Sequence, residues 1–175
     1  GTLEKIRTTK TIALGYRDSS VPFSYAGPTK EPMGYSVDLC TRAVEDLRRD
    51  LKLPDLQVTW VPVSVETRVR ALVNGTIDLE CGSTTNNSER QKQVGFSDTI
   101  FIIGTRLMTK TNSGIKDFPD LAGKNVVTTA GTTSERLLRK MNEDKQMKMH
   151  IISAKDHGEA FLTLETGRMA KLSDG

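Results

Sequence analysis

The chain has 175 residues, enough to bury a sizeable core in one domain or in two small lobes. Hydrophobic residues make up 36% and charged residues 27% of the sequence, as is typical of globular proteins, and no apolar run approaches the roughly 18–20 residues that cross a bilayer. The 25 basic and 22 acidic residues are mixed along the chain and leave a net charge of +3, and only 5% of the residues are aromatic, so nucleic acid is not an expected partner.

The sequence predicts neither a metal site nor a cofactor. It contains only two histidines, His150 and His157, and its two cysteines, Cys40 and Cys81, lack the spacing of metal ligands. Two states of the cysteines stay open, a disulfide in an oxidising compartment or a pair of buried thiols. No signal peptide is recognisable, so we expect either a cytoplasmic protein or the mature form of a secreted one.

The first half of the chain alternates apolar strands with amphipathic helices. Residues 11–16 are predicted to form a buried strand, and residues 27–32, rich in glycine and proline, a turn. From residue 34 the apolar period becomes helical, and residues 56–61 alternate as a second strand. The apolar face of the first helix is expected to contain Cys40, Ala43, Val44, Leu47 and Leu51.

A second helix and a third strand complete this half. Ser64 is the expected N-cap of the helix, Asn74-Gly75 its expected stop, and residues 76–79 the third strand. Strand, helix, strand, helix, strand is the order of a doubly wound parallel sheet, in which ligands bind at the carboxyl ends of the strands. The packing residues of the second helix are expected to be Val65, Val69, Leu72 and Val73.

Hydroxyl and amide side chains follow the third strand in close succession. Asn86 is predicted to cap a short helix, with Glu89 at the capping-box position. Hydroxyls and free N–H groups at a helix start favour anions, and Arg90 adds a planar fork that can hold a carboxylate. We therefore predict a carboxylate pocket over residues 83–90. The alternative is a polar turn beside a solvated arginine.

Two further arginines are expected near the same edge of the sheet. Arg17 follows the first strand, and Arg68 lies early in the second helix. Together with Arg90, three arginines are expected to converge there, which would be costly without an anion and favours an acidic ligand. The alternative for Arg68 is an ordinary surface position.

The second half of the chain repeats this pattern. Residues 97–109 are expected to form a long strand that crosses between two lobes, and residues 125–129 and 150–154 two further strands. Thr133 and His157 are expected at the starts of the helices that follow these two strands, so Thr133 repeats the anion-site argument, whereas His157 can equally be a surface residue. Thr132 and Glu135 have capping-box spacing. The packing residues of the helices are expected to be Leu137, Leu138, Met141, Ala160, Phe161 and Leu164.

Taken together, the motifs resemble periplasmic solute-binding proteins for polar amino acids, most closely the glutamate/aspartate-binding subfamily. The resemblance covers residues 3 to about 168, and its specificity comes from the order and spacing of several motifs rather than from any one of them. These motifs are residues 15–25, 34–38, 74–78, 80–90, 96–98, 115–121, 131–133 and 152–158.

The resemblance implies a fold, a location and partners. We expect two α/β lobes with doubly wound sheets that are joined by hinge strands and close on the ligand, with lobe 1 at residues 1–107 and part of lobe 2 at residues 108–175. The expected ligand is L-glutamate or L-aspartate, which the protein passes to the permease of an ABC transporter. A mature periplasmic protein without its signal peptide is the expected form.

The resemblance also implies roles for individual residues. Arg90 is expected to hold the α-carboxylate of the ligand, and Arg17 and Arg68 its side-chain carboxylate, which would select acidic over neutral amino acids. Thr133 and His157 are expected to close on the ligand from the second lobe. The complete set of implied ligand-binding residues is Arg17, Arg68, Ser83, Thr85, Arg90, Thr133 and His157.

The chain departs from the family near residue 168. The family continues beyond this point, and residues 169–175 are polar where an apolar strand is expected. The second lobe is therefore expected to be incomplete, and its uncovered apolar faces would favour self-association.

Two other functions share this fold. An enzyme of the dehydratase type would need an acid or base in the cleft, for which His157 and Glu80 are the candidates. A sensory ligand-binding domain of a receptor would use the same ligand chemistry. The expectation is a transport protein without enzymatic activity.

Overall fold

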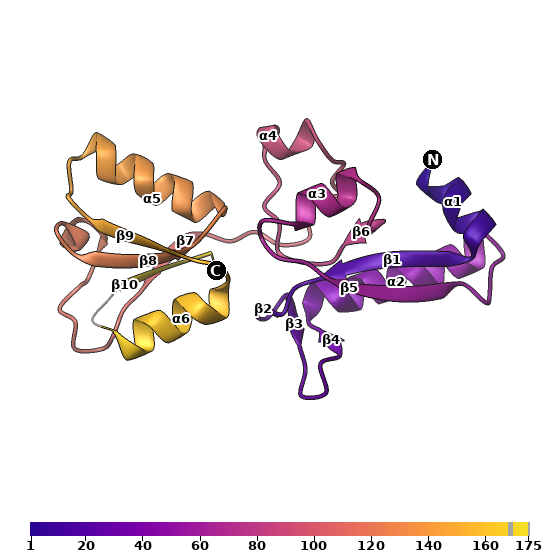
Figure 1. The fold of residues 1–175 in the computed structure, drawn as a ribbon, viewed down its shortest axis with the longest axis horizontal. Helices are drawn as coiled ribbons and strands as arrows, with labels where there is room; N and C mark the ends of the chain where they lie inside the picture. The colour runs from indigo at the N-terminus through magenta and orange to yellow at the C-terminus, as the bar shows by residue number, and fades with distance from the viewer. Residues whose placement is uncertain (168–169, 175) are drawn as a thin grey trace. The chain divides into compact units, whose positions relative to one another are not determined.

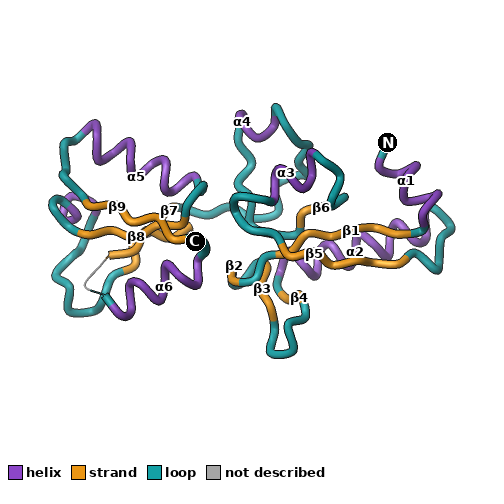
Figure 2. The backbone as a smooth tube through the Cα atoms, in the orientation of Figure 1, coloured by secondary structure: helices purple, strands orange, loops and turns teal. Residues whose placement is uncertain are grey.

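The computed structural model describes residues 1–167 and 170–174, which form two compact α/β units (Figure 1). Unit 1 spans Gly1–Phe96, and unit 2 begins at Ser97. This division lies earlier than the lobe boundary expected at residues 107–108, which falls inside a strand of unit 2. The helices and strands of both units are distinguished in Figure 2. Among the described residues no helix is long and apolar enough to span a membrane.

Unit 1 is built on a parallel sheet with the strand order β5-β1-β6, and a small antiparallel sheet, β2-β3-β4, lies beside it. The central strand β1 pairs with β5 along its whole length and with β6 over two residues. In sequence order the elements are α1 (Thr2–Thr9), β1 (Thr11–Tyr16), β2 (Ser19–Ser20), β3 (Ser24–Ala26), β4 (Pro32–Met33), α2 (Tyr35–Asp50), β5 (Gln57–Pro62), α3 (Arg68–Val73), β6 (Leu79–Glu80) and α4 (Ser88–Gln91).

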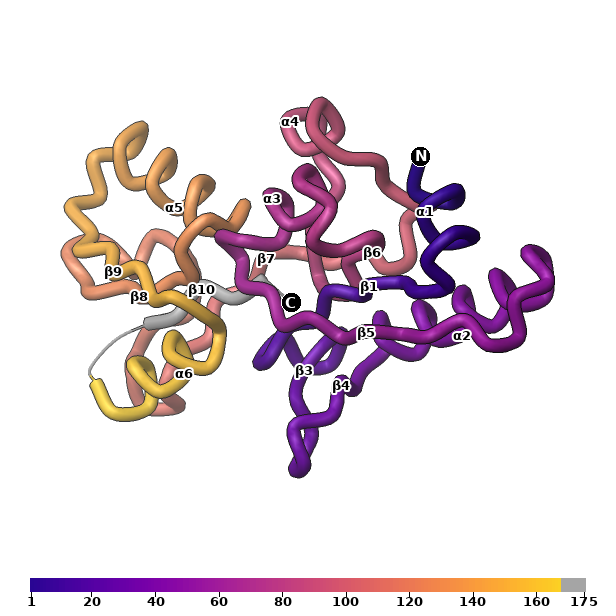
Figure 3. The backbone as a smooth tube through the Cα atoms, turned by 45° about the vertical axis from the view of Figure 1, so that its right-hand side comes forward, coloured from indigo at the N-terminus to yellow at the C-terminus, as the bar shows by residue number. Residues whose placement is uncertain are grey.

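Helices cover both faces of the parallel sheet, as in a doubly wound fold (Figure 3). On one face, Ile12 and Leu14 of β1 pack with Cys40 and Val44 of α2. On the other face Val63, Ala71 and Ile77 form a second core beside α3. Gly15 of β1 allows Ile77 to pack closely against the strand, because a Cβ at this position would lie 2.5 Å from Ile77 Cδ1 and force that side chain to shift.

Parts of unit 1 differ from the sequence expectations. Helix α1 was not predicted, and neither were the two- and three-residue strands β2, β3 and β4. Ser64 was expected to cap the second helix, but its hydroxyl accepts from Thr67 N–H in a turn that precedes the helix, and α3 begins at Arg68. Val73, expected to pack inward, is exposed, because it lies in the last turn of this short helix.

The two cysteines of unit 1 form a disulfide, which decides between the two states that the sequence left open. Cys40 lies on α2, and Cys81 directly follows β6. Both are buried in the core between α2 and the sheet. The bond therefore links a helix to the end of a strand across 41 residues of sequence.

Unit 2 contains a sheet with the strand order β7-β10-β8-β9. Strands β10, β8 and β9 are parallel, and β7 is antiparallel to β10. Figures 1 and 3 both show α5 and α6 on opposite sides of β8 and β9. The elements are β7 (Thr105–Met108), η1 (Phe118–Leu121), β8 (Asn125–Thr129), α5 (Thr133–Asp144), β9 (His150–Ala154), α6 (His157–Thr166) and β10 (Ala170–Asp174).

The core of unit 2 is divided by its sheet. Val126 of β8 packs with Leu138 of α5, and Val127, the next residue, packs with Ala160 and Leu164 of α6. Adjacent residues of a strand point to opposite faces, so β8 is buried on both sides. The two-lobed α/β class expected from the sequence is confirmed by these two units.

Two expectations for unit 2 are wrong. The run at residues 97–109 was expected to be one long strand, but only Thr105–Met108 is a strand, because a strand extends only where a neighbouring strand pairs with it, and β7 pairs with β10 over these four residues. Leu137 and Phe161 were expected to pack inward, but they are 52% and 46% exposed. Leu138 on α5 and Ala160 on α6, the residues next to them in sequence, face the core instead.

The end of the chain is described only in part. Arg168, Met169 and Gly175 lie outside the described residues. Strand β10 is described by its backbone, which pairs with β7 and β8.

Candidate functional site

The carboxyl edge of the sheet in unit 1 contains two of the three arginines that the sequence predicted there. Since β5, β1 and β6 are parallel, their carboxyl ends meet at one edge. Arg17 comes directly after β1, and Arg68 is the first residue of α3, which follows β5. Ser83 follows β6 at the same edge. Alternation of parallel strands and helices therefore places three predicted site residues together.

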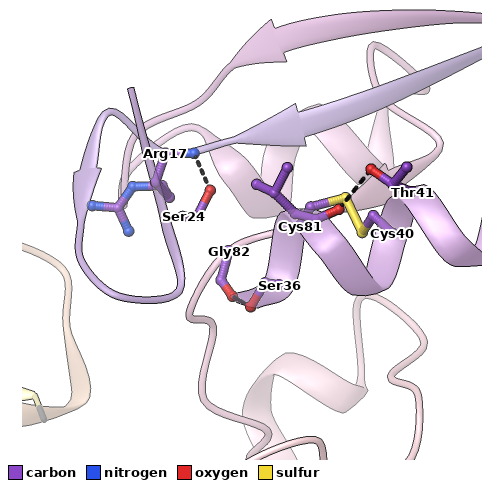
Figure 4. The surroundings of a disulfide bond; sticks show 8 residues. Arg17, Ser24, Ser36, Cys40, Thr41, Cys81 and Gly82 are labelled. Carbon is purple, nitrogen blue, oxygen red and sulfur yellow. Dashed lines mark hydrogen bonds between the residues drawn. A yellow bond between two sulfur atoms is a disulfide. The ribbon is translucent and has the colours of Figure 1, made fainter. Parts of the chain in front are cut away.

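Arg17 and Arg68 are both buried. Arg17 is 1% and Arg68 is 3% exposed, so the alternative of an ordinary surface position for Arg68 is excluded. The backbone N–H of Arg17 donates to Ser24 Oγ of β3 at 2.9 Å, which ties the end of β1 to the small sheet (Figure 4). Buried guanidinium groups are costly, and proteins retain them mostly where they meet anions or specific hydrogen-bond acceptors.

The segment after β6 is held by successive contacts. Cys81 N–H donates to Gly15 O at 2.8 Å, and the hydroxyl of Ser36 on α2 donates to Gly82 O at 2.7 Å (Figure 4). The next hydroxyl, Ser83 Oγ, lies 2.6 Å from Ser20 Oγ of β2. The backbone and side chains of this segment are therefore ordered by three different elements.

The predicted helix after this segment forms, but its cap lies one residue later than expected. Asn87, not Asn86, is the N-cap of α4, and its Oδ1 accepts from Arg90 N–H at 2.9 Å. Asn86 instead accepts from the side chain of Gln91 at 2.7 Å. The Asn87 oxygen accepts from the N–H three residues ahead, which is the usual reach of an N-cap side chain.

Arg90 is half-buried and folds back along the chain. Its guanidinium Nη1 donates to the carbonyl of Thr85 at 2.9 Å, while the Thr85 side chain stays exposed. Helix α4 has only four residues, so its dipole contributes little, and the anion-binding capacity of this region depends on Arg90 and nearby hydroxyl and N–H groups. Hydrogen bonds to Thr85 and Asn87 thus join Arg90 to the polar residues before it in one folded segment.

In unit 2 the predicted residues also lie at a carboxyl edge. Thr133 is the first residue of α5, which follows β8, and His157 is the first residue of α6, which follows β9. Strands β8 and β9 are parallel neighbours. Thr129, the last residue of β8, places its Oγ1 2.7 Å from His157 Nδ1, so the imidazole is held against the end of β8.

The helices at this edge are capped by similar pairs of residues. Thr132 Oγ1 accepts from Glu135 N–H at 3.1 Å, and Asp156 Oδ1 accepts from Glu159 N–H at 2.8 Å. The carboxylate of Glu135 in turn accepts from Gly131 N–H at 2.8 Å. The capping pair predicted at residues 132 and 135 is confirmed at the Thr132 hydroxyl.

Glu135 is the centre of a small polar network. Its carboxylate also accepts from Ser153 and Arg139. Partial burial raises the pKa of Glu135, but the hydrogen bonds from Ser153, Gly131 N–H and Arg139 outweigh burial and leave the pKa below its ordinary value. The carboxylate therefore stays ionised and keeps the start of α5 in place at neutral pH.

The structure adds residues that the sequence did not single out. Ser20, Ser36 and Thr129 contact the predicted site segments, each from a distant part of the chain. Isolated serines and threonines carry no signal of their own in a single sequence, so only their contacts identify them. Glu80, named as a candidate acid, ends β6, and its buried Oε1 has no hydrogen-bond partner among the described residues.

The comparison with protein families matches residues 12–167 to the bacterial extracellular solute-binding proteins, family 3. The chain is 61% identical over 169 residues to the L-glutamate/L-aspartate-binding protein of Pseudomonas aeruginosa, across 96% of this chain and 56% of that protein. It is 58% identical over 167 residues to the glutamate/aspartate import solute-binding protein of Salmonella typhimurium, across 95% of this chain and 55% of that protein.

Solved structures show the same fold. An ancestral amino-acid-binding protein, AncCDT-1, a precursor of cyclohexadienyl dehydratase, has a TM-score of 0.85 and 27% identity, across 99% of this chain and 74% of its own. A truncated, arginine-bound arginine-binding protein from T. maritima has a TM-score of 0.85 and 24% identity, across 98% of this chain and 77% of its own. This second similarity concerns the fold alone.

The chain spans only about 55% of the length of the curated relatives that it resembles at 56–61% identity. Within that span the matched family covers almost the whole sequence. The α/β units and the strand-edge position of the polar segments agree with this match. The chain therefore belongs to the bacterial extracellular solute-binding proteins of family 3.

Proposed function

We propose that this chain is the ligand-binding part of a solute-binding protein that captures L-glutamate or L-aspartate for an ABC-type importer. The observation that carries the proposal is the burial of Arg17 and Arg68 at the carboxyl edge of one sheet. Two buried guanidinium groups at a ligand-binding edge favour an anionic ligand over a neutral one. The names of the curated relatives, which bind or import glutamate and aspartate, support the same ligand class.

The proposed roles follow the chemistry of the side chains. Arg90, with the Ser83 hydroxyl and nearby backbone at Thr85, holds the α-carboxylate, because a guanidinium can donate two parallel hydrogen bonds to it. Arg17 and Arg68 receive the side-chain carboxylate. A neutral ligand such as glutamine would leave these two cations without that charge, which costs affinity.

Unit 2 supplies the second set of contacts in this proposal. Thr133 and His157 offer a hydroxyl, an imidazole and N–H groups at the starts of the helices that follow two neighbouring strands. We assign unit 1 to lobe 1 and unit 2 to lobe 2. Unit 1 captures the ligand first, and closure of unit 2 then adds contacts and shifts the protein to its bound form.

The proposed partner of the whole protein is the permease of an ABC importer, and its proposed location is the periplasm. The family consists of extracellular solute-binding proteins, and the curated relatives at 56–61% identity are described as binding proteins rather than enzymes. No catalytic step is assigned to Glu80 or His157. Self-association through unit 2 is a further proposal, and sedimentation at several protein concentrations tests it.

Calorimetric titration of the chain with L-glutamate, L-aspartate and L-glutamine tests the proposed ligand. We expect binding of the two acidic amino acids and binding of glutamine that is weaker by at least about tenfold, the effect of one lost charged contact. Equal affinity for glutamate and glutamine would contradict the role of the buried arginines. The same titration of a chain extended to the length of the curated relatives shows whether the remaining part of the protein adds affinity.

A further inference from the structure

The disulfide lies immediately before the polar segment that the proposed function uses. Cys81 follows β6, and Gly82 and Ser83 come next in the chain. Its partner Cys40 lies on α2, and both sulfur-bearing side chains are buried (Figure 4). The covalent link therefore fixes the point at which the chain leaves the sheet and enters the proposed ligand-binding segment.

Helix α2 holds this segment at two consecutive residues. Ser36, one helical turn before Cys40, donates its hydroxyl hydrogen to Gly82 O at 2.7 Å, and Ser36 is itself buried. A covalent bond to residue 81 and a buried hydrogen bond to residue 82 thus come from the same face of one helix (Figure 4). These two attachments leave little freedom for the backbone at Gly82.

The position of Gly82 matters for Arg17. A Cβ on residue 82 would lie 3.1 Å from Arg17 Cγ and 2.0 Å from Glu80 Oε1, so the side chain of Arg17 packs closely against the backbone of residue 82. On the other side Ser83 Oγ lies 2.6 Å from Ser20 Oγ. A shift of the Gly82 backbone would therefore move both Ser83 and the stem of Arg17.

We propose that the Cys40–Cys81 disulfide and Ser36 are positioning residues for acidic-ligand binding, which act by holding Gly82 so that Arg17 and Ser83 keep their binding geometry. This inference rests on the function proposed above and extends it to residues that do not touch the ligand. Binding sites depend on supporting contacts of this kind, because displacement of a ligand-binding group by about 1 Å is enough to weaken its hydrogen bonds.

If the disulfide and Ser36 only stabilised the fold, their removal would lower stability without changing the affinity of the folded protein. Cys40 and Cys81 share their core with Val44, which lies one turn further along α2. Truncation of Val44 creates a cavity and lowers stability, but in the described part of the chain neither a covalent bond nor a hydrogen bond joins the Val44 side chain to residues 82–85. Positioning residues should change affinity in protein that is still fully folded, and core residues should not.

The test compares two variants with two matched controls, all in the 175-residue chain. The variants are Cys40→Ala/Cys81→Ala, which removes the disulfide, and Ser36→Ala, which removes only the hydroxyl that binds Gly82 O. The controls are Val44→Ala and Thr41→Val, since among the described residues the Thr41 hydroxyl bonds only to Val37 O within α2. Circular dichroism selects a temperature at which every protein is folded.

Two measurements are made on each protein. Calorimetry gives the affinity for L-glutamate, which we expect to fall about tenfold in both variants and less than about twofold in both controls. Hydrogen exchange followed by mass spectrometry gives the protection of the amides at residues 82–85, which we expect to fall about tenfold in the variants, while strand β1 keeps its protection.

The outcomes separate this inference from the proposed function. If the unmodified chain binds none of the acidic amino acids, the proposed ligand is wrong, and the exchange at residues 82–85 still decides whether the disulfide and Ser36 hold this segment. Unchanged exchange in both folded variants overturns the inference. Unchanged glutamate affinity in both variants, when the unmodified chain binds glutamate, overturns it as well.

Discussion

Thr129 and His157 meet at the carboxyl edge of the sheet in unit 2, with Thr129 Oγ1 2.7 Å from His157 Nδ1. Thr129 is the last residue of β8 and is buried, whereas His157 is the first residue of α6 and is half-buried. The contact orients the imidazole at this edge of the sheet. Thr129 would in this way orient a proposed ligand-binding histidine.

Thr129→Val should lower the affinity for L-glutamate by about three- to tenfold, because the loss of one buried hydrogen bond lets the imidazole rotate. Thr129→Ser, which keeps the hydroxyl, should retain the affinity. Thr128→Val is a matched control, because Thr128 lies on the same strand and its buried Oγ1 has no hydrogen-bond partner among the described residues. Calorimetry on the three variants checks this, and equal affinities for Thr129→Val and Thr128→Val would exclude the orienting role.

Arg68→Ala should reduce discrimination between glutamate and glutamine more than it reduces affinity for glutamine. The physical reason is that the buried Arg68 is proposed to meet the side-chain carboxylate, which glutamine lacks. We expect glutamate affinity to fall about tenfold or more and glutamine affinity to change by about twofold or less.

Arg90→Ala provides the comparison for Arg68→Ala. Because both ligands carry the α-carboxylate assigned to Arg90, this variant should lose affinity for both. Competition binding measures the ratio of glutamate affinity to glutamine affinity in each of the two variants. If Arg68→Ala lost the same amount of affinity for both ligands, Arg68 would not contact the side-chain carboxylate.

Asp78→Ala should lower the free energy of unfolding of unit 1 by about 1–3 kcal/mol. The carboxylate of Asp78 accepts from Ala13 N–H at 2.9 Å and from Lys5 Nζ at 2.7 Å, and it connects α1 with β1 and the start of β6. The Asp78 side chain is 5% exposed, so its loss leaves a buried donor without a partner.

Lys5→Ala is the matched control for Asp78. The Lys5 side chain is 41% exposed, so solvent screens its charge, and we expect Lys5→Ala to cost about 0–1 kcal/mol. Urea denaturation measures both variants. A larger effect for Lys5→Ala than for Asp78→Ala would mean that the ion pair, not the bond to Ala13, stabilises this corner.

Glu135→Gln should lower the melting temperature of unit 2 in a pH-dependent way. The pKa of Glu135 is lowered in the folded protein from its ordinary value of 4.5, so its stabilising contribution is fully present above pH 4.5 and is lost as the pH falls through the folded pKa. The difference between the unmodified chain and Glu135→Gln should therefore be largest near neutral pH and shrink in acid.

Glu143→Gln, an exposed substitution on the same helix, controls for the general effect of charge on α5. Calorimetric melts from neutral pH down to about pH 3 follow both variants, a range that spans the titration of ordinary carboxyl groups. A difference between the unmodified chain and Glu135→Gln that does not change with pH would contradict the assigned network.

The amino-acid sequence by itself determined the parts of this protein that depend on local interactions. The apolar period of α2, with Cys40 and Val44 on its buried face, and the capping pair Thr132 and Glu135 are set by residues within a few positions of each other. The order of strands and helices predicted a parallel sheet, and that order is sufficient to place Arg17 after its first strand.

Only the tertiary structure decided the features that join distant segments. The disulfide spans 41 residues of sequence, and Ser20 and Ser83 meet across 63. Strands as short as β2 exist only because a neighbouring strand pairs with them, and the run at residues 97–109 is a strand only where β10 pairs with β7. Pairing, burial and side-chain contacts across the chain depend on which segments the whole fold brings together, and no window of local sequence contains that information.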